Sequence, residues 1–106
     1  MNIAGMMKQA QAMQTKMQDV EARMTQTEVE GTAGGGAVRV MLSCKGEPKS
    51  IALDAEVVNP AEKDLLEDLI LAALKDAFKK GQETAAAEMK KVMGGLNLPP
   101  GLNLPF

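Results

Sequence analysis

The sequence has 106 residues, a net charge of −2, one Cys and no His. A chain of this length forms one domain with a modest core. Without His there is no Cys–His or Ser–His catalytic pair, and the commonest metal ligand is missing. One Cys can form neither an intrachain disulfide nor a zinc site. We therefore expect neither an enzyme nor a bound cofactor.

The sequence also predicts where the protein resides. No run of 18 apolar residues is present, so no membrane span is expected. The start of the chain, Met1-Asn2-Ile3, lacks the basic flank and apolar run of a signal peptide. A single Cys suits a reducing compartment. These features predict a cytoplasmic protein.

Residues 3–24 show the pattern of a long amphipathic helix. Apolar or small residues recur at steps of three and four, which is the spacing of a helix that packs along another helix. A helix cannot cover its own apolar side, so the rest of the chain or a second copy must do so. The residues of this N-terminal stripe are Ile3, Met6, Ala10, Met13, Met17, Val20 and Met24.

Basic residues lie roughly opposite the N-terminal stripe. On a wheel of about 100° per residue, Lys8, Lys16 and Arg23 fall within about 80° of one another. Asp19 falls in the same sector and weakens its positive charge. Taken alone, this pattern favours an ordinary solvent-exposed helix face.

The middle of the chain predicts three short strands. From Thr25 the apolar period changes to two, and this pattern is clearest over residues 37–44. Gly34-Gly35-Gly36 permits a tight reversal, and short connections make neighbouring strands antiparallel. Cys44 is expected to be a buried, unreactive thiol. The predicted inward-facing residues of the second and third strands are Val38, Val40, Leu42, Cys44, Ile51 and Leu53.

A second long helix is predicted after the strands. Asn59 can cap it and Pro60 suits its first position, and the pattern continues to about Met93. Its first half is broadly apolar and is expected to cover the sheet, whereas its second half, from Gln82, is expected to project as an arm. The predicted fold class is α+β: a helix, a three-stranded antiparallel meander and a long C-terminal helix (α-β-β-β-α).

We expect one domain over residues 1–93 and a tail over residues 94–106 rich in Gly, Pro and Leu. The tail repeats Gly95-Leu96-Asn97-Leu98-Pro99 as Gly101-Leu102-Asn103-Leu104-Pro105. Its prolines disfavour a helix. It is either a flexible tail or an extended segment that binds a groove, on its own dimer or on a partner.

Several motifs resemble one protein family over essentially the whole chain. They are Met7-Lys8-Gln9-Ala10-Gln11-Ala12-Met13-Gln14 with Lys16-Met17, Gly36-Ala37-Val38-Arg39-Val40, Leu65-Leu66-Glu67-Asp68-Leu69-Ile70-Leu71-Ala72-Ala73 and Leu98-Pro99-Pro100-Gly101. With this order of elements, the sequence resembles the YbaB/EbfC family of bacterial nucleoid-associated proteins. The resemblance implies a homodimer with projecting helical arms. It also implies binding of double-stranded DNA in the cytoplasm and nucleoid, with effects on nucleoid organisation and gene expression.

The resemblance places DNA contacts on the projecting helices. The implied DNA-binding residues are Lys8, Gln9, Lys16, Lys79, Lys80, Lys90 and Lys91. The residues expected in the core or at the dimer contact are Met6, Met13, Met17, Val38, Val40, Leu66 and Ile70. With two Arg and no Trp or Tyr, we expect recognition of the DNA backbone with weak sequence preference. The alternative is an interaction module for a replication or recombination protein.

Overall fold

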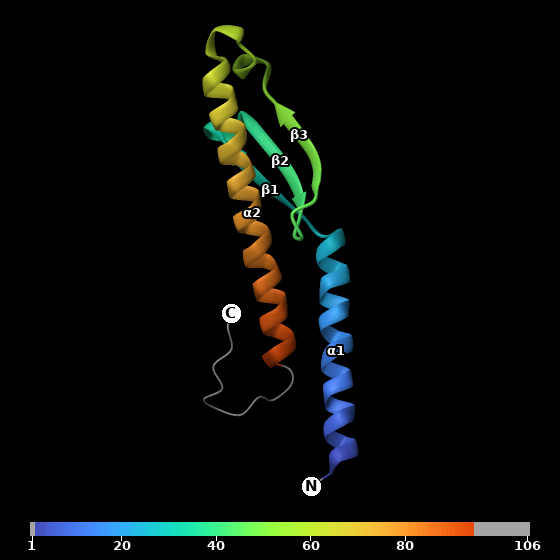
Figure 1. The fold of residues 1–106 in the computed structure, drawn as a ribbon. Helices are drawn as coiled ribbons and strands as arrows, with labels where there is room; N and C mark the ends of the chain where they lie inside the picture. The colour runs from blue at the N-terminus through green and yellow to red at the C-terminus, as the bar shows by residue number, and fades with distance from the viewer. Residues whose placement is uncertain (1, 95–106) are drawn as a thin grey trace.

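The structure, a computed structural model, describes residues 2–94 (Figure 1). It contains α1 (Ile3–Gln26), β1 (Glu28–Ala33), β2 (Val38–Ser43), β3 (Pro48–Leu53) and α2 (Lys63–Gly94). Single turns of 3-10 helix lie at Gly34–Gly36, Ala55–Val57 and Pro60–Glu62. This order confirms the predicted α+β class with an α-β-β-β-α arrangement.

The three strands form an antiparallel meander in the order β1-β2-β3. The register pairs Gly31 with Val40 and Val40 with Ile51. Gly34, Gly35 and Gly36 have φ of 65°, 70° and 96°, which explains why glycine occupies the first reversal. The helix start predicted at Asn59 is also confirmed, because its Oδ1 accepts the N–H of Ala61 at 3.0 Å and the chain enters α2 directly after this turn.

Helix α2 packs closely on β1 and β2. The buried residues of this contact are Val38, Val40, Leu42, Ala73 and Ala77. Ala73 and Ala77 of the helix face Gly31 of β1. A Cβ on Gly31 would overlap the backbone of Ala73 and Ala77, so the helix and the strand are almost in backbone contact.

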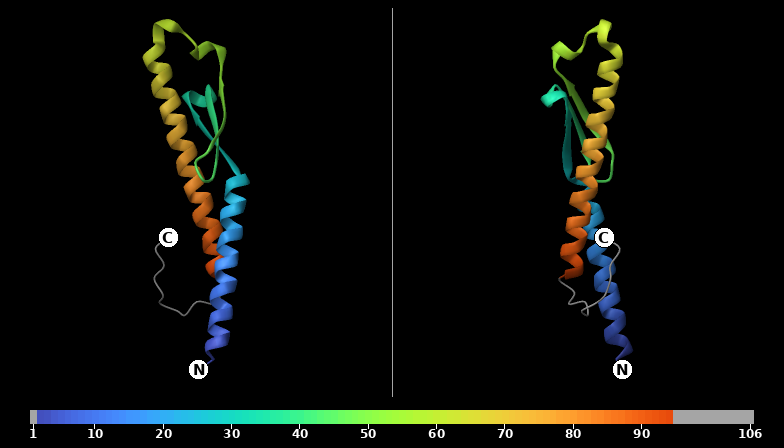
Figure 2. Two further views of the ribbon diagram at one scale, coloured as in Figure 1. Left: turned by 45° about the vertical axis from the view of Figure 1, so that its right-hand side comes forward. Right: turned by 90° about the vertical axis from the view of Figure 1, so that its left-hand side faces the viewer.

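A second buried cluster joins α1 to the rest of the chain. Val20 and Met24 of α1 and Cys44 are its buried members, and Val29, Ala85, Met89 and Val92 pack against them. Helix α1 therefore lies against the second half of α2, and the two run antiparallel (Figure 2). We call α1 together with residues 82–94 of α2 the arm. Cys44 is buried, as predicted, and its low reactivity stays a prediction.

The arm gives the chain an elongated shape, with principal extents of 71 × 26 × 16 Å. The sheet lies beside the first half of α2, and the first turns of α1 extend past the end of α2 (Figure 1). Neither long helix described here has an 18-residue stretch apolar enough to cross a membrane.

Two surfaces that were expected to be covered are exposed in the single chain. Met6, expected in the core or at a dimer contact, is 57% exposed, so it lies outside the core, and its place at a dimer contact stays a prediction. Ile51 and Leu53 pair with Val40 and Val38 and so share their face of the sheet, yet they are 54% and 37% exposed. Helix α2 covers β1 and β2 and leaves β3 bare.

The other residues of the predicted core or dimer contact show graded burial. Val38 and Val40 are buried in the main core. Met13, Met17, Leu66 and Ile70 are half-buried. The N-terminal stripe is therefore covered only over its second half.

Candidate nucleic-acid interface

Charge is segregated along the length of the molecule. Residues 2–18, at the end of the arm, contain Lys8 and Lys16 and no acidic residue. Residues 54–68, at the opposite end, contain six carboxylates and one lysine, a net charge of −5. Figure 1 shows that the two segments lie at opposite ends of the long axis. This distribution favours a polyanion at the end of the arm and disfavours one at the opposite end of the molecule.

The lysines at the end of α1 are available to a ligand. Lys8, Gln9 and Lys16 are exposed, and neither lysine has an ion-pair partner within residues 2–94. Asn2 caps the helix, since its Oδ1 accepts the N–H of Gly5 at 3.1 Å. This cap holds the first turn, and thereby Lys8, in helical geometry.

The ammonium group of Lys80 is engaged in contacts within the protein. Its Nζ lies 3.0 Å from Asp76 Oδ2 and donates to the carbonyl oxygen of Glu30 at 3.0 Å. The other contact of Asp76 Oδ2 is the backbone N–H of Thr32, at 3.0 Å. That hydrogen bond, and next the one from Lys80, lowers the pKa of Asp76. The cluster ties α2 to the exposed edge of β1.

Neighbouring Lys79, in contrast, is available to contact a ligand. It is exposed and has no ion-pair partner in the described part of the chain. The two lysines were predicted together, but the structure separates a free cation from one that stabilises the helix–strand contact.

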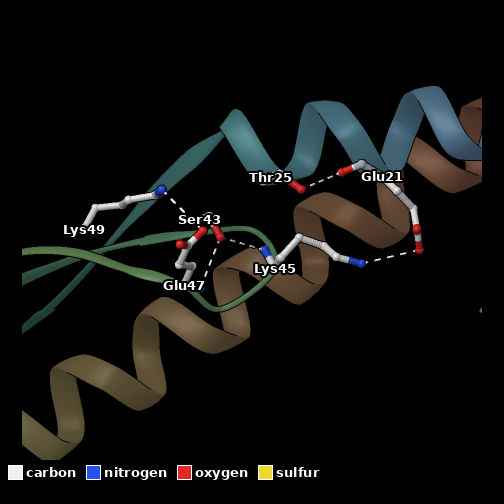
Figure 3. Close-up of polar contacts among 6 residues, drawn as sticks. All are labelled: Glu21, Thr25, Ser43, Lys45, Glu47 and Lys49. Atoms are coloured by element: carbon white, nitrogen blue, oxygen red, sulfur yellow. Dashed lines mark hydrogen bonds and ion pairs between the residues drawn. The ribbon is translucent and has the colours of Figure 1, made fainter.

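Acidic residues on the arm are partly neutralised by cations. Glu88 lies 3.5 Å from Arg23 Nη1 and 3.2 Å from Lys91 Nζ, so one carboxylate joins α1 to α2. Glu21 of α1 lies 3.4 Å from Lys45 in the turn between β2 and β3 (Figure 3). That turn is held by Ser43, whose Oγ accepts the N–H groups of Lys45 and Glu47 at 3.2 and 3.1 Å. These pairs compensate the two carboxylates locally, and they engage Arg23 and the predicted DNA-binding residue Lys91 at the same time.

The predicted DNA-binding residues fall into two groups. Lys8, Gln9 and Lys16 lie on the arm with Lys90 and Lys91 of α2. Lys79 and Lys80 lie beside the sheet, where Lys80 is held by Glu30 of β1. Lys80 and Lys91 are about 17 Å apart along α2 at about 1.5 Å per residue. The structure therefore places five of the predicted residues on the arm and two beside the sheet, and of the five Lys91 is already paired with Glu88.

A second surface feature is an apolar groove between β3 and α2. One hollow of about 320 Å³ is lined by Val40, Pro48, Lys49, Ser50, Ile51, Ile70 and Leu74. A second hollow, of about 440 Å³, is lined by Glu67, Asp68, Ile70, Leu71 and Leu74. We call the combined surface of Ile51, Ile70, Leu71 and Leu74 the apolar groove. The sequence pattern had included only Ile70 among the interface residues, because the exposure of Ile51 and Leu71 depends on where α2 crosses the sheet.

The fold and its charges define the class of protein first. It is a small, elongated α+β protein with a helical arm whose end is basic. The family model described as the YbaB/EbfC DNA-binding family matches residues 1–96. The chain belongs to this family. Membership assigns it a binding role and not a catalytic one, in agreement with the prediction from composition.

Relatives match the chain over nearly its full length. A nucleoid-associated protein of Granulibacter bethesdensis is 51% identical and covers 99% of this chain and 98% of its own. One from Maricaulis maris is 50% identical with the same coverage. The crystal structure of an uncharacterized Helicobacter pylori protein matches with a TM-score of 0.75 at 20% identity, covering 89% of this chain and 99% of that one. This last similarity supports the fold.

Proposed function

We propose that this chain binds the phosphate backbone of double-stranded DNA as a homodimer, through the lysines of its arm. The observation that carries the proposal is the charge segregation: an acid-free end of the arm bearing Lys8 and Lys16, and a net charge of −5 at the opposite end. Although the whole chain is acidic, this distribution of charge would direct bound DNA to the end of the arm. Family membership supports the same role.

We expect the lysines to contact DNA phosphates and not to recognise the bases. Lysine is a flexible point charge that suits phosphate, whereas bidentate base recognition mostly uses Arg. Both arginines of the chain are engaged in ion pairs, Arg23 with Glu88 and Arg39 with Asp54. We expect weak sequence preference. About six phosphate contacts per dimer would make affinity fall with roughly the fifth power of salt concentration.

The homodimer is proposed to form across the apolar groove. Ile51 and Leu71 are each more than half exposed, and β3 is an edge strand of the sheet. A hydrophobic groove beside an unpaired strand edge is the kind of surface that a symmetric dimer buries. Dimerisation doubles the number of arms, and so the number of phosphate contacts.

In the cell, we propose that the protein is associated with the nucleoid and acts in nucleoid organisation and gene expression. The relatives described as nucleoid-associated proteins support this location. Binding with weak sequence preference suits it, because such a protein can occupy many positions along DNA.

Reversing charge at the arm tests the DNA proposal. Fluorescence anisotropy of a labelled duplex of about 30 base pairs should show at least a tenfold loss of affinity for Lys8→Glu/Lys16→Glu in low salt. Lys63→Glu, at the acidic end, is the control, because it reverses one exposed lysine there. Equal affinities of the wild type and the double variant would refute the proposed contact surface.

Adding a charge to the groove tests the dimer. Ile51→Asp should shift the mass measured by light scattering toward the 11.2 kDa of one chain. Ala52→Asp is the matched control, because it adds the same charge on the opposite face of the same strand, where Ala52 pairs with Arg39. A dimer that persists in Ile51→Asp would exclude this groove as the interface.

A further inference from the structure

The first turns of α1 carry apolar side chains that no described residue covers. Ile3 is 67% exposed, Met6 57% and Met7 59%. Farther along the same helix, Val20 and Met24 are 1% and 4% exposed. The N-terminal stripe thus continues beyond the part that the fold buries.

The reason is the length of α2. The 3.5 Å contact between Arg23 and Glu88 fixes the relative level of the two antiparallel helices. Gly94 ends α2 six residues after Glu88, which brings its end to the level of roughly Met17 at about 1.5 Å per residue. From that level to Ile3, about 21 Å of α1 has no neighbouring helix.

We propose that residues 95–106 of the same chain occupy this uncovered face of α1. The segment begins where α2 ends, at the inner edge of the bare surface. Its twelve residues, if extended at about 3.1 Å each, span about 37 Å, which exceeds the 21 Å needed. Because the two partners belong to one chain, their effective concentration is in the millimolar range, and a small apolar contact is sufficient.

The chemistry of the segment complements the face. It has no charged side chain, and its apolar residues are Leu96, Leu98, Leu102, Leu104 and Phe106. Within each repeat the leucines are two residues apart, about 6 Å in an extended chain, which approximates the 5.4 Å pitch of the helix. Its prolines lower the entropy lost on docking. Met6 and Met7 can adapt their side chains to such a partner.

Docking on this face leaves Lys8 accessible. Lys8 lies about 160° from Met6 on the helical wheel. The segment would therefore support the end of the arm without covering this lysine. The inference stands independently of the proposed DNA binding.

Methionine oxidation of the full-length protein tests the proposal. With dilute hydrogen peroxide and peptide mass spectrometry, Met6 and Met7 in Leu98→Asp/Leu104→Asp should oxidise about tenfold faster than in the wild type, if the segment is docked about nine-tenths of the time. Buried Met24 should be unchanged in both proteins and reports that the domain remains folded.

The matched control is Asn97→Asp/Asn103→Asp, which adds the same two charges between the leucines. It should retain the protection of Met6 and Met7. Equal oxidation rates in the wild type and the leucine variant would overturn the proposal. So would protection that disappears on dilution, because it would assign the covering partner to a second copy of the chain.

Discussion

Replacing Gly31 by Ala tests how closely β1 and α2 approach. A Cβ at this position would lie 2.6 Å from Ala77 Cβ and closer still to the carbonyl oxygen of Ala73 and the amide nitrogen of Ala77. Gly31 is not among the glycines with positive φ, so backbone strain contributes nothing. The expected effect is entirely steric, and it requires α2 to move away from the sheet.

The magnitude follows from the atoms involved. Overpacking a core usually costs about 1–3 kcal/mol, and the upper end applies where the obstacle is backbone. Ala73 and Ala77 are fully buried beside Val38 and Leu42, so a shift of α2 also opens that core. We expect a loss of about 3 kcal/mol, or a fall in Tm of about 12–24 °C for a domain of this size.

Thermal unfolding followed by circular dichroism at one fixed protein concentration measures this loss, since Tm of an oligomer depends on concentration. Gly94→Ala is the control, because a Cβ there would lie within 4 Å of no packing partner among residues 2–94. It should leave Tm unchanged or slightly higher. A Gly31→Ala protein whose Tm stays within about 2 °C of the wild type would refute the backbone contact described here.

Three further predictions concern ionisable side chains. The lowered pKa of Asp76 means that its contribution to stability is present above the ordinary pKa of 3.8 and is lost as pH falls through the lower value of the folded state. Asp76→Asn should therefore flatten the fall of the urea midpoint below about pH 4, and parallel curves for the two proteins would contradict this. Burial raises the pKa of Cys44, so Ellman's reagent should react at least about tenfold faster with the urea-unfolded chain than with the folded one; similar rates would mean that the thiol is accessible. Lys80 already contacts Asp76 and Glu30, so Lys80→Ala should lower Tm more than Lys79→Ala does. Lys79→Ala should weaken DNA binding more than Lys80→Ala. The opposite order in both assays would exclude a structural role for Lys80 and a binding role for Lys79.

Local sequence patterns were sufficient for the order of elements. The steps of three and four up to Met24, the alternation around Val40 and the cap at Asn59 each predicted an element that the structure contains. These signals depend on residues close together in the chain. The level at which α2 passes α1 depends on tertiary packing, so the exposure of Met6 could not be read from its place in a regular stripe.

The same limit applies to the candidate site. The lysines were found through a family resemblance, but the sequence could not distinguish Lys79 from Lys80. The partner that does so, the carbonyl oxygen of Glu30, lies 50 residues away in the chain. Likewise, Glu88 joins Arg23 only because the two helices run antiparallel. Ion pairs of this kind require the fold to be known.

The continuity of α2 has a mechanical consequence. One helix of 32 residues, about 48 Å long, lines the apolar groove at one end and forms the arm at the other. From the groove to Gly94 the helix measures about 33 Å, so a rotation of about 10° at the groove would move the far end by about 6 Å. That displacement exceeds the axial spacing of phosphates along one DNA strand, about 3.4 Å. In the proposed dimer, substitutions in the groove would thus change the spacing between the two arms, and with it the match to DNA, without altering any of the proposed DNA-binding residues.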